Sequence, residues 1–268
     1  MTRSDWNDLP AEVLEAITRT TGPIRGVRSA DLGNHADIAS TVAGEHGTLF
    51  VKAARKLPDK DGPEVMSLRW EAKVNPFLGE FAPRLHWTVE SGGWLVLGFE
   101  HVPGRHPDYA PGSPDLGLVA QAVQALQKTP LPAVVDRPVT MRWEGLGDAS
   151  PMAGTALLHT DINAGNVLVT DRREVRFVDW AFVSHGAPWV EMGQMIPWLL
   201  GAGHTPASAE EWLGQFPAWA AADSASIDQY ARLHVAVWSR RHQMASAEWI
   251  GLYLADVRRW AKHRGVLE

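Results

Sequence analysis

Two carboxylates and a carboxamide stand at short spacing in the middle of the chain. Asp161 and Asn166 lie in the segment LLHTDINAGNVLV (157–169), and Asp179 follows in the segment FVDWA (177–181). Phosphoryl transfer uses one carboxylate to orient a hydroxyl proton, and a separate set of hard oxygen ligands for Mg²⁺. Asp161 suits the first role, and Asn166 with Asp179 suits the second. These residue types at this spacing favour phosphoryl transfer to a hydroxyl group.

The apolar runs between these residues indicate how they are positioned. Val167–Val169 and Val175–Val178 are short β-branched runs separated by the polar residues 170–173. Two such runs around a polar turn predict a β-hairpin. The hairpin is expected to return Asp179 close to Asn166, and loops held by rigid elements are where catalytic groups usually lie.

The same segment resembles the catalytic loop of aminoglycoside phosphotransferases and related small-molecule kinases. That loop is commonly written H-G-D-x-x-x-x-N, and a metal-binding Asp before an aromatic residue follows it. The chain matches the pattern at His159, Asp161, Asn166 and Asp179. It departs at Thr160, where the family usually has Gly, and at residues 164–165, where Pro-Gly is common.

The resemblance implies a fold and a reaction. The fold is α+β and protein-kinase-like, with an N-terminal nucleotide-binding lobe (1–100) and a C-terminal catalytic and acceptor-binding lobe (101–268). The first lobe would hold an antiparallel sheet with one main helix, and the second would be mostly helical with the catalytic β-hairpin. The hinge is expected at about 99–104. ATP and Mg²⁺ are the implied cofactors, with a small-molecule hydroxyl as acceptor. Asp161 would be the catalytic residue.

Local patterns agree with strands first and helices later, which is typical of α+β proteins. A compact apolar run predicts a strand at 49–53, and two runs around Ser91-Gly92-Gly93 predict a hairpin of 87–90 with 94–99. Predicted helices occupy residues 9–20, 64–81 and 115–128, and most of the chain after residue 189.

Lys52 ends an apolar strand, as does the lysine that binds phosphates in the third strand of kinases. An isolated match of this kind is more often a surface lysine. Its carboxylate partner is expected on the following helix, where Glu64 and Glu71 are seven residues apart and share a face. The spacing leaves both open. The resemblance favours Glu71, whereas Glu64 suits the first turn of a helix.

Three more positions are expected to contact the nucleotide. Asn34 lies in SADLGNHAD (29–37), where kinases place a loop over the phosphates, although the segment lacks the G-x-G-x-x-G pattern and fits an ordinary turn equally well. The adenine ring of kinase substrates bonds to backbone groups of the hinge, which here includes Glu100 and Val102.

Other family features are expected to be structural. By the resemblance, His159 braces the catalytic loop, and Glu191 stands near a family Asp that ties the next helix to that loop. Four further acids lie in the helical part, where relatives bind acceptors, and each is individually more typical of a solvated helix face: Glu210, Glu211, Asp223 and Asp228.

Composition narrows the partners. The chain has 268 residues and a formal net charge of −6, so a concentrated basic face for nucleic acid is not expected. It has no cysteine, which excludes disulfides and thiolate chemistry. No apolar run is long enough for a membrane span, and we expect a cytoplasmic protein with neither nucleic-acid nor membrane partners. The oligomeric state cannot be predicted.

Two alternatives stay open. The chain could be a catalytically silent kinase-fold module, a hypothesis supported by Thr160 and the atypical phosphate loop. It could also be an iron oxygenase in which His159 and Asp161 join His185 or His204 in a facial triad. The helical second half argues against the latter. The acceptor is unidentified in any case, because relatives that share the catalytic loop phosphorylate amino sugars, choline-like alcohols and other metabolites.

Overall fold

The computed structural model describes residues 4–30, 36–245 and 247–268, so the predicted phosphate-loop residue Asn34 lies outside the described residues. The chain divides into two compact units. One comprises Met1–Arg105 with Leu168–Phe182, and we call it the sheet unit; the other comprises His106–Val167 with Val183–Glu268, and we call it the helical unit.

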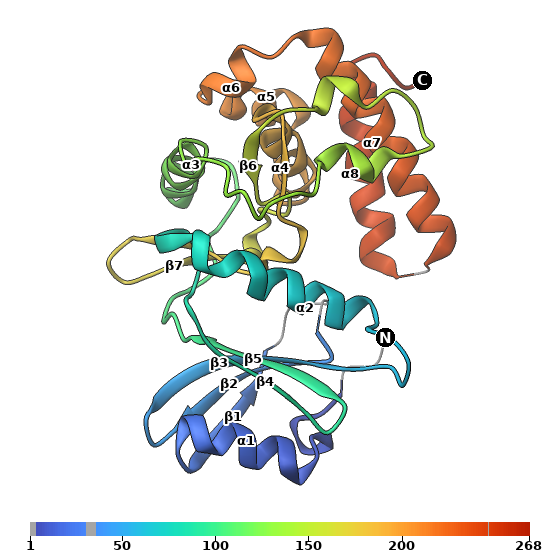
Figure 1. The fold of residues 1–268 in the computed structure, drawn as a ribbon. Coiled ribbons are helices and arrows are strands. Elements are labelled where there is room, and N and C mark those ends of the chain that lie inside the picture. The colour runs from blue at the N-terminus through green and yellow to red at the C-terminus, as the bar shows by residue number, and fades with distance from the viewer. Residues whose placement is uncertain (1–3, 31–35, 246) are drawn as a thin grey trace. The chain divides into compact units, whose positions relative to one another are not determined.

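The sheet unit is built on a five-stranded antiparallel sheet with the strand order β1-β2-β3-β5-β4 (Figure 1). Its strands are β1 (Ile24–Ser29), β2 (Ile38–Gly44), β3 (Gly47–Arg55), β4 (Leu85–Ser91) and β5 (Trp94–Glu100). Its helices are α1 (Ala11–Thr21) and α2 (Pro63–Val74), and they lie on opposite sides of the sheet in Figure 1.

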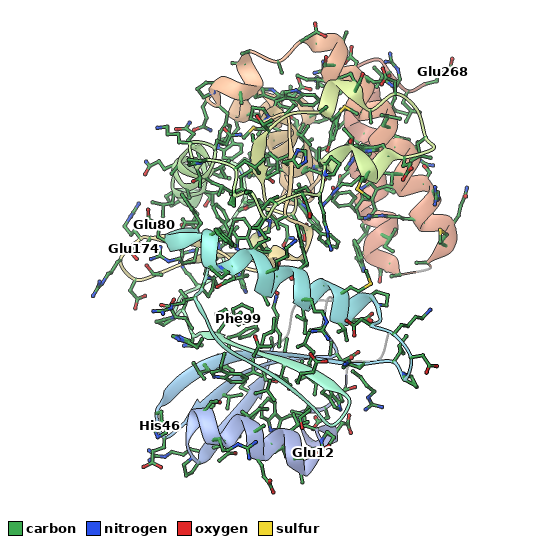
Figure 2. The ribbon with its side chains drawn as sticks, viewed as in Figure 1. Glu12, His46, Glu80, Phe99, Glu174 and Glu268 are labelled. Atoms are coloured by element: carbon green, nitrogen blue, oxygen red, sulfur yellow. The ribbon has the colours of Figure 1, made fainter. Side chains whose placement is uncertain are left out.

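Strand alternation explains the two covered faces. Val51 and Ala53 of β3 join Val13 and Ile17 of α1 in one apolar cluster. Ala54 packs with residues of α2 on the other face. Because successive strand residues point to opposite faces, the alternation places Lys52 on the α2 side of the sheet. Phe99 of β5 lies on this side too, as Figure 2 shows.

The helix predicted for 64–81 ends earlier than expected. α2 stops at Val74, and two short 3₁₀ turns follow at Asn75–Phe77 and Gly79–Phe81. Pro76 explains the difference, since proline lacks a backbone donor and clashes with the preceding helical turn. The Asn75 side chain then fixes the exit, accepting from Leu85 N at 2.7 Å and donating to the carbonyl of Pro83 at 2.8 Å.

The predicted β-hairpin is present as β7 (Val167–Val169) and β8 (Val175–Phe177). Its turn closes with Thr170 N donating to the Glu174 carbonyl at 2.9 Å, and Arg173 in the turn has a φ of 60°. In the sheet unit, Arg105 and Val169 exchange two backbone hydrogen bonds of 2.8 and 3.0 Å, which join the hairpin to the segment after β5.

The helical unit surrounds a small antiparallel pair, β6 (Ala156–Leu158) with β9 (Ser184–Gly186). Its helices are α3 (Asp115–Leu126), α4 (Trp189–Gly201), α5 (Pro206–Leu213), α6 (Pro217–Ala220), α7 (Ser224–Met244) and α8 (Glu248–His263). Nearly every side chain of α4 is buried, which is expected of a helix that is apolar all round. α7 and α8 pack through an apolar cluster centred on Trp238 and Tyr253.

The predicted fold class is therefore confirmed. An antiparallel sheet occupies the N-terminal part, and the C-terminal part is mainly helical. None of the helices within the described residues is both long and apolar enough to cross a membrane.

Candidate active site

In the sheet unit, Lys52 is the centre of a buried ion cluster. Its Nζ lies 2.8 and 3.0 Å from the two carboxylate oxygens of Glu71, and 3.1 Å from Oδ1 of Asp179. The Lys52 side chain is 11% exposed, and the ring of Phe99 lies beside its ammonium with the centroid at 5.9 Å. Three segments far apart in sequence thus place β3, α2 and the hairpin exit around one cation.

The charges of this cluster do not cancel. Burial alone lowers the pKa of the Lys52 ammonium, but the charges of Asp179 and Glu71 outweigh it and raise that pKa above its ordinary value. Lys52 therefore stays protonated at any physiological pH. One ammonium faces two carboxylates, so the cluster has an excess of negative charge, which favours a further cation at the Asp179 end.

Asp179 is set by an unusual backbone. β8 ends at Phe177, and Asp179 then adopts a φ of 62°, a left-handed conformation that Asp tolerates better than most residues. Trp180 follows at once in a 3₁₀ turn (Trp180–Phe182), donating its backbone N–H to Glu71 Oε1 at 3.3 Å and its indole N–H to the Phe177 carbonyl at 2.8 Å. These two hydrogen bonds hold the turn that directly follows Asp179.

In the helical unit, the Asp161 carboxylate accepts two amide hydrogen bonds. Asn163 Nδ2 donates to Oδ1 at 3.1 Å, and Asn166 Nδ2 donates to Oδ2 at 2.8 Å. Asn166 Nδ2 also reaches the Asp161 carbonyl at 3.0 Å, so the carboxamide oxygen of Asn166 points elsewhere. His159 braces the loop, because its Nδ1 accepts from the Asp161 backbone N–H at 3.2 Å. Asp161 is half-buried.

The loop before Asp161 is held by a buried carboxylate. Glu191 of α4 accepts the backbone N–H of His159 at 2.6 Å and that of Thr160 at 2.8 Å. Burial raises the pKa of the Glu191 carboxyl to about 7, although these two hydrogen bonds oppose the shift. A glutamate here therefore makes the link between helix and loop that the family resemblance assigned to a nearby Asp.

Thr160 shows why a glycine is usual at its position. Its φ is 67°, a region that β-branched residues rarely enter and that glycine reaches without steric cost. Besides the Glu191 contact, its hydroxyl accepts a hydrogen bond from the guanidinium of Arg142 in a 3₁₀ turn (Val139–Trp143). These two contacts hold the strained backbone beside Asp161.

The remaining candidate residues are Glu100, Val102 and Glu64. Glu100 ends β5, and its carboxylate accepts from Arg84 N at 3.2 Å. Val102 is half-buried in the irregular segment that follows. Glu64 lies in the first turn of α2, whereas the ion pairs of Lys52 are with Glu71 and Asp179.

The iron hypothesis was wrong. Throughout residues 4–30, 36–245 and 247–268, no three His, Cys, Asp or Glu side chains come together as a metal-binding group. His185 Nδ1 instead lies 2.8 Å from the Gly154 carbonyl, and His204 Nε2 lies 3.0 Å from the Tyr109 carbonyl. Both imidazole rings therefore contact backbone carbonyl groups of neighbouring segments.

Sequence reasoning missed Arg142 altogether. It lies in a stretch without periodicity, and nothing in its neighbours marks it. Another pattern is visible in the sequence. One helix face after residue 224 is expected to carry polar aromatic groups and a cation, because the spacings between them are four, four and three residues: Tyr230, His234, Trp238 and Arg241.

Comparisons with known proteins find likeness in structure and not in sequence. No family model matches the sequence, and no curated protein does. The structure is similar to choline kinase LicA from Streptococcus pneumoniae, with a TM-score of 0.66 and 13% identity over 94% of this chain and 98% of the other.

Two further solved structures are similar over comparable lengths. A microcompartment-associated aminopropanol kinase gives a TM-score of 0.59 at 14% identity, covering 96% of this chain and 99% of the other. An aminoglycoside-3'-phosphotransferase of type VIII gives 0.53 at 18% identity, covering 94% and 98%. The chain therefore has the same fold as these three solved kinases.

Proposed function

We propose that the protein is an ATP- and Mg²⁺-dependent phosphotransferase that transfers the γ-phosphoryl group to a hydroxyl of a small molecule. The observation that carries this proposal is the Lys52 cluster, in which a buried ammonium is shared between Glu71 of α2 and Asp179. Burying the ammonium of a lysine costs free energy, and kinases use a lysine held in this way to bind the phosphates of the nucleotide.

On the nucleotide side, Lys52 neutralises phosphate oxygens and Glu71 holds its ammonium in place. Glu100 ends β5 and Val102 lies just after it, and both offer backbone groups to the adenine ring. One solved relative, LicA, was determined in complex with AMP, which supports a nucleotide site in this fold. Asn34 is proposed as a further phosphate contact from its position in the sequence alone.

The donor types of the two expected ligands suit a magnesium ion. In the sheet unit Asp179 offers a carboxylate, and in the helical unit Asn166 offers a carboxamide oxygen, since its Nδ2 is used by Asp161. That both residues hold one ion is proposed from the sequence pattern alone. Mg²⁺ needs only one or two protein ligands because phosphates and water complete its shell. When bound, it would neutralise charge that develops on the transferred phosphoryl group.

On the acceptor side, Asp161 orients the attacking hydroxyl. In the transfer, a bond forms between the acceptor oxygen and the γ-phosphorus, and the bond from that phosphorus to the β-γ bridging oxygen breaks, leaving ADP. The acceptor proton passes to Asp161. The amide donors of Asn163 and Asn166 hold this carboxylate in one orientation, so catalysis is mainly positioning and charge stabilisation.

Calorimetric titration of ATP, with Mg²⁺ and then with EDTA, tests the nucleotide half of the proposal. Binding should require Mg²⁺ and should be lost in Asp179→Ala. Asp171→Ala is the matched control, since it removes an exposed carboxylate from the turn of the same hairpin. An ATP affinity that is unchanged by EDTA and by Asp179→Ala would contradict the proposed metal site.

A catalytically silent nucleotide-binding module is the second candidate. It is favoured by the left-handed backbone of Thr160, a strained residue directly before the proposed catalytic carboxylate. ADP release on addition of acceptor alcohols separates the two: a module binds the nucleotide and never turns it over.

A further inference from the structure

A pocket of about 440 Å³ lies within the helical unit. One of its walls belongs to the segment 111–117, which enters α3, and the other belongs to the segment 204–212, which contains most of α5. We call it the α3–α5 pocket. None of the described residues of the proposed nucleotide, metal and catalytic sites lines it. Small-molecule sites commonly have volumes of about 300–1,000 Å³, so this pocket is large enough for a small organic ligand.

Hydrogen bonds hold both walls of the pocket in place. In the turn of residues 110–113, the first carbonyl accepts from the last backbone N–H at 3.0 Å. On the other wall, Nε2 of the buried His204 lies 3.0 Å from the Tyr109 carbonyl. Thr205 and Ser208 exchange hydrogen bonds of 3.0 and 3.1 Å where α5 begins. A ligand therefore meets walls that are already ordered, which lowers the entropy cost of binding.

Two glycines line the pocket where any other residue would add a side chain. A Cβ built on Gly112 or Gly117 would meet no atom within 4 Å. The φ of Gly112 is 81°, which by itself explains a glycine in the turn. Gly117 lies inside α3, where its φ is ordinary and where glycine is a poor helix former compared with alanine. Neither strain nor crowding requires a glycine at this position, and its effect is to leave the pocket open.

The pocket contains a carboxylate without a countercharge. Glu211 lines it, and across the described ranges the Glu211 side chain has neither an ion pair nor a hydrogen bond. The other acids of this part of the chain are engaged. Glu210 and Asp228 bind Arg264 at 2.8 and 2.6 Å, and Asp223 caps α7. Glu211 is therefore free to attract a positively charged ligand.

The residue next to this carboxylate is aromatic. Trp212 is half-buried, lines the pocket, and meets Phe216 edge-on with ring centroids 5.3 Å apart. Among the residues that the structure describes, no lysine or arginine lies over the Trp212 ring. Tryptophan attracts a cation over its face more strongly than the other aromatic side chains do. The buried Leu116 adds apolar surface, so the lining suits a ligand with a cationic group on an apolar body.

We propose that the α3–α5 pocket binds a small organic cation, with its ammonium group beside Glu211 and its apolar body against Trp212 and Leu116. The inference goes beyond the proposed function and does not depend on it, because the pocket uses none of the residues assigned to phosphoryl transfer. Residues 159–166 do not line the pocket, so a cation bound there is not the phosphoryl acceptor. The helical unit would thus hold a second small-molecule site.

Calorimetric titration of the full chain with three matched probes tests the charge of the ligand. Phenethylamine is a cation at neutral pH, phenethyl alcohol is its neutral counterpart, and phenylacetate is an anion of similar size. We expect the amine to bind about fivefold more tightly than the alcohol, through the carboxylate and the indole face. Phenylacetate should not bind measurably, because Glu211 repels it.

Two variants test the place of binding. Gly117→Leu should abolish amine binding by filling the pocket, and it should fold, because the new Cβ meets no atom and leucine favours a helix. Glu211→Gln should weaken amine binding about fivefold and leave the affinity for the alcohol unchanged. The matched controls are Ala125→Leu, an exposed position of α3 outside the pocket lining, and Glu248→Gln, an exposed glutamate of α8. Neither control should change amine affinity, and melting temperatures check that all four variants fold.

Several outcomes would overturn the inference: no amine binding, equal affinities for the amine and the alcohol, preference for phenylacetate, or amine binding that survives Gly117→Leu. ATP titration of the same variants separates it from the proposed function. Gly117→Leu should leave ATP affinity unchanged, and loss of both ligands in this folded variant would count against a separate amine site. Absence of ATP binding by the wild type would contradict the kinase proposal and leave the amine site standing.

Discussion

In the sheet unit Asp179 is held by the charge of Lys52, whereas in the helical unit Asp161 is held by the neutral amides of Asn163 and Asn166. A carboxylate paired with an ammonium keeps its charge and its place, and it suits the binding of further ions. Amide donors orient a carboxylate without adding a countercharge of their own, which suits a group that accepts a hydroxyl proton. Under the proposed function, this difference would suit the sheet unit to binding and the helical unit to proton transfer.

The sharpest way to test the division is Asp161→Asn. The substitution preserves shape and removes the proton acceptor, so turnover should fall by roughly 10²- to 10⁴-fold, the range for a lost general base. ATP affinity should stay within about twofold, since the phosphate contact proposed for Lys52 lies in the sheet unit. ADP release and calorimetry measure the two quantities. Asp171→Asn, in the exposed hairpin turn, is the control, and undiminished turnover in Asp161→Asn contradicts the assignment.

Lys52→Met should destabilise the sheet unit by removing the cation of its buried ion cluster. It leaves Glu71 and Asp179 buried without their cation, and losing one partner of a buried pair costs about 3–5 kcal/mol of unfolding free energy. Urea unfolding measures this.

The control is Lys56→Met, since Lys56 pairs with Glu90 at the surface, where their side chains are 33% and 41% exposed. That change should cost no more than about 1 kcal/mol. Equal losses of unfolding free energy in the two variants would mean that the Lys52 cluster contributes no more to stability than a surface ion pair.

Burial of Glu191 should make the unfolding free energy of the protein depend on pH. Burial raises the pKa of this carboxyl from 4.5 to about 7, so between these values the folded state binds a proton that the unfolded state has released. The stability associated with this group is therefore fully present below about pH 4.5 and is lost as pH rises through 7. Glu191→Gln should flatten the unfolding free energy over this window, by an amount on the order of a few kcal/mol.

That variant also carries its own cost. An amide accepts at only one of its two positions, so either His159 N or Thr160 N loses its partner, at about 1–3 kcal/mol. Stability profiles of both proteins from pH 4 to 8 separate the uniform cost from the pH-dependent part. A wild-type profile already flat between pH 4.5 and 7 would contradict the buried, protonated carboxyl.

The smallest expected effect concerns the left-handed residues. Arg173→Gly relieves a φ of 60° in an exposed turn and should stabilise the protein by up to about 1 kcal/mol, the left-handed penalty less the entropy cost of glycine. Thr160→Gly relieves a φ of 67° but removes the hydroxyl that binds Arg142, so it should gain less or nothing. Thermal unfolding compares them, and an equal gain would show that the Arg142 contact contributes nothing.

The parts of this molecule that follow from local patterns could be predicted from sequence. Two strand-like runs around Ser91-Gly92-Gly93 predicted the hairpin of β4 and β5, and two β-branched runs around a polar turn predicted β7 and β8. The end of α2 was misjudged because Pro76 was given too little weight against an apolar run that continues to Phe81. The roles of the candidate site residues stay predictions.

What the sequence could not supply is set by contacts between distant segments. The choice between Glu64 and Glu71 depends on where α2 lies on the sheet, and helical spacing puts both on one face. Arg142 lies in an aperiodic segment, and its link to Thr160 depends on the packing of a 3₁₀ turn against a loop. The positive φ of Thr160 was equally invisible, since only a glycine would have marked it.

The sheet unit is discontinuous, and this limits how the chain can be divided. The polypeptide leaves this unit after Arg105 and returns for Leu168–Phe182. A fragment that ends at the first crossing would keep Lys52 and Glu71 but would lack Asp179, leaving a neutral ion pair in place of the anionic cluster. During synthesis, the N-terminal unit cannot be completed until residue 182 has emerged, so its folding has to wait for much of the other unit to be made.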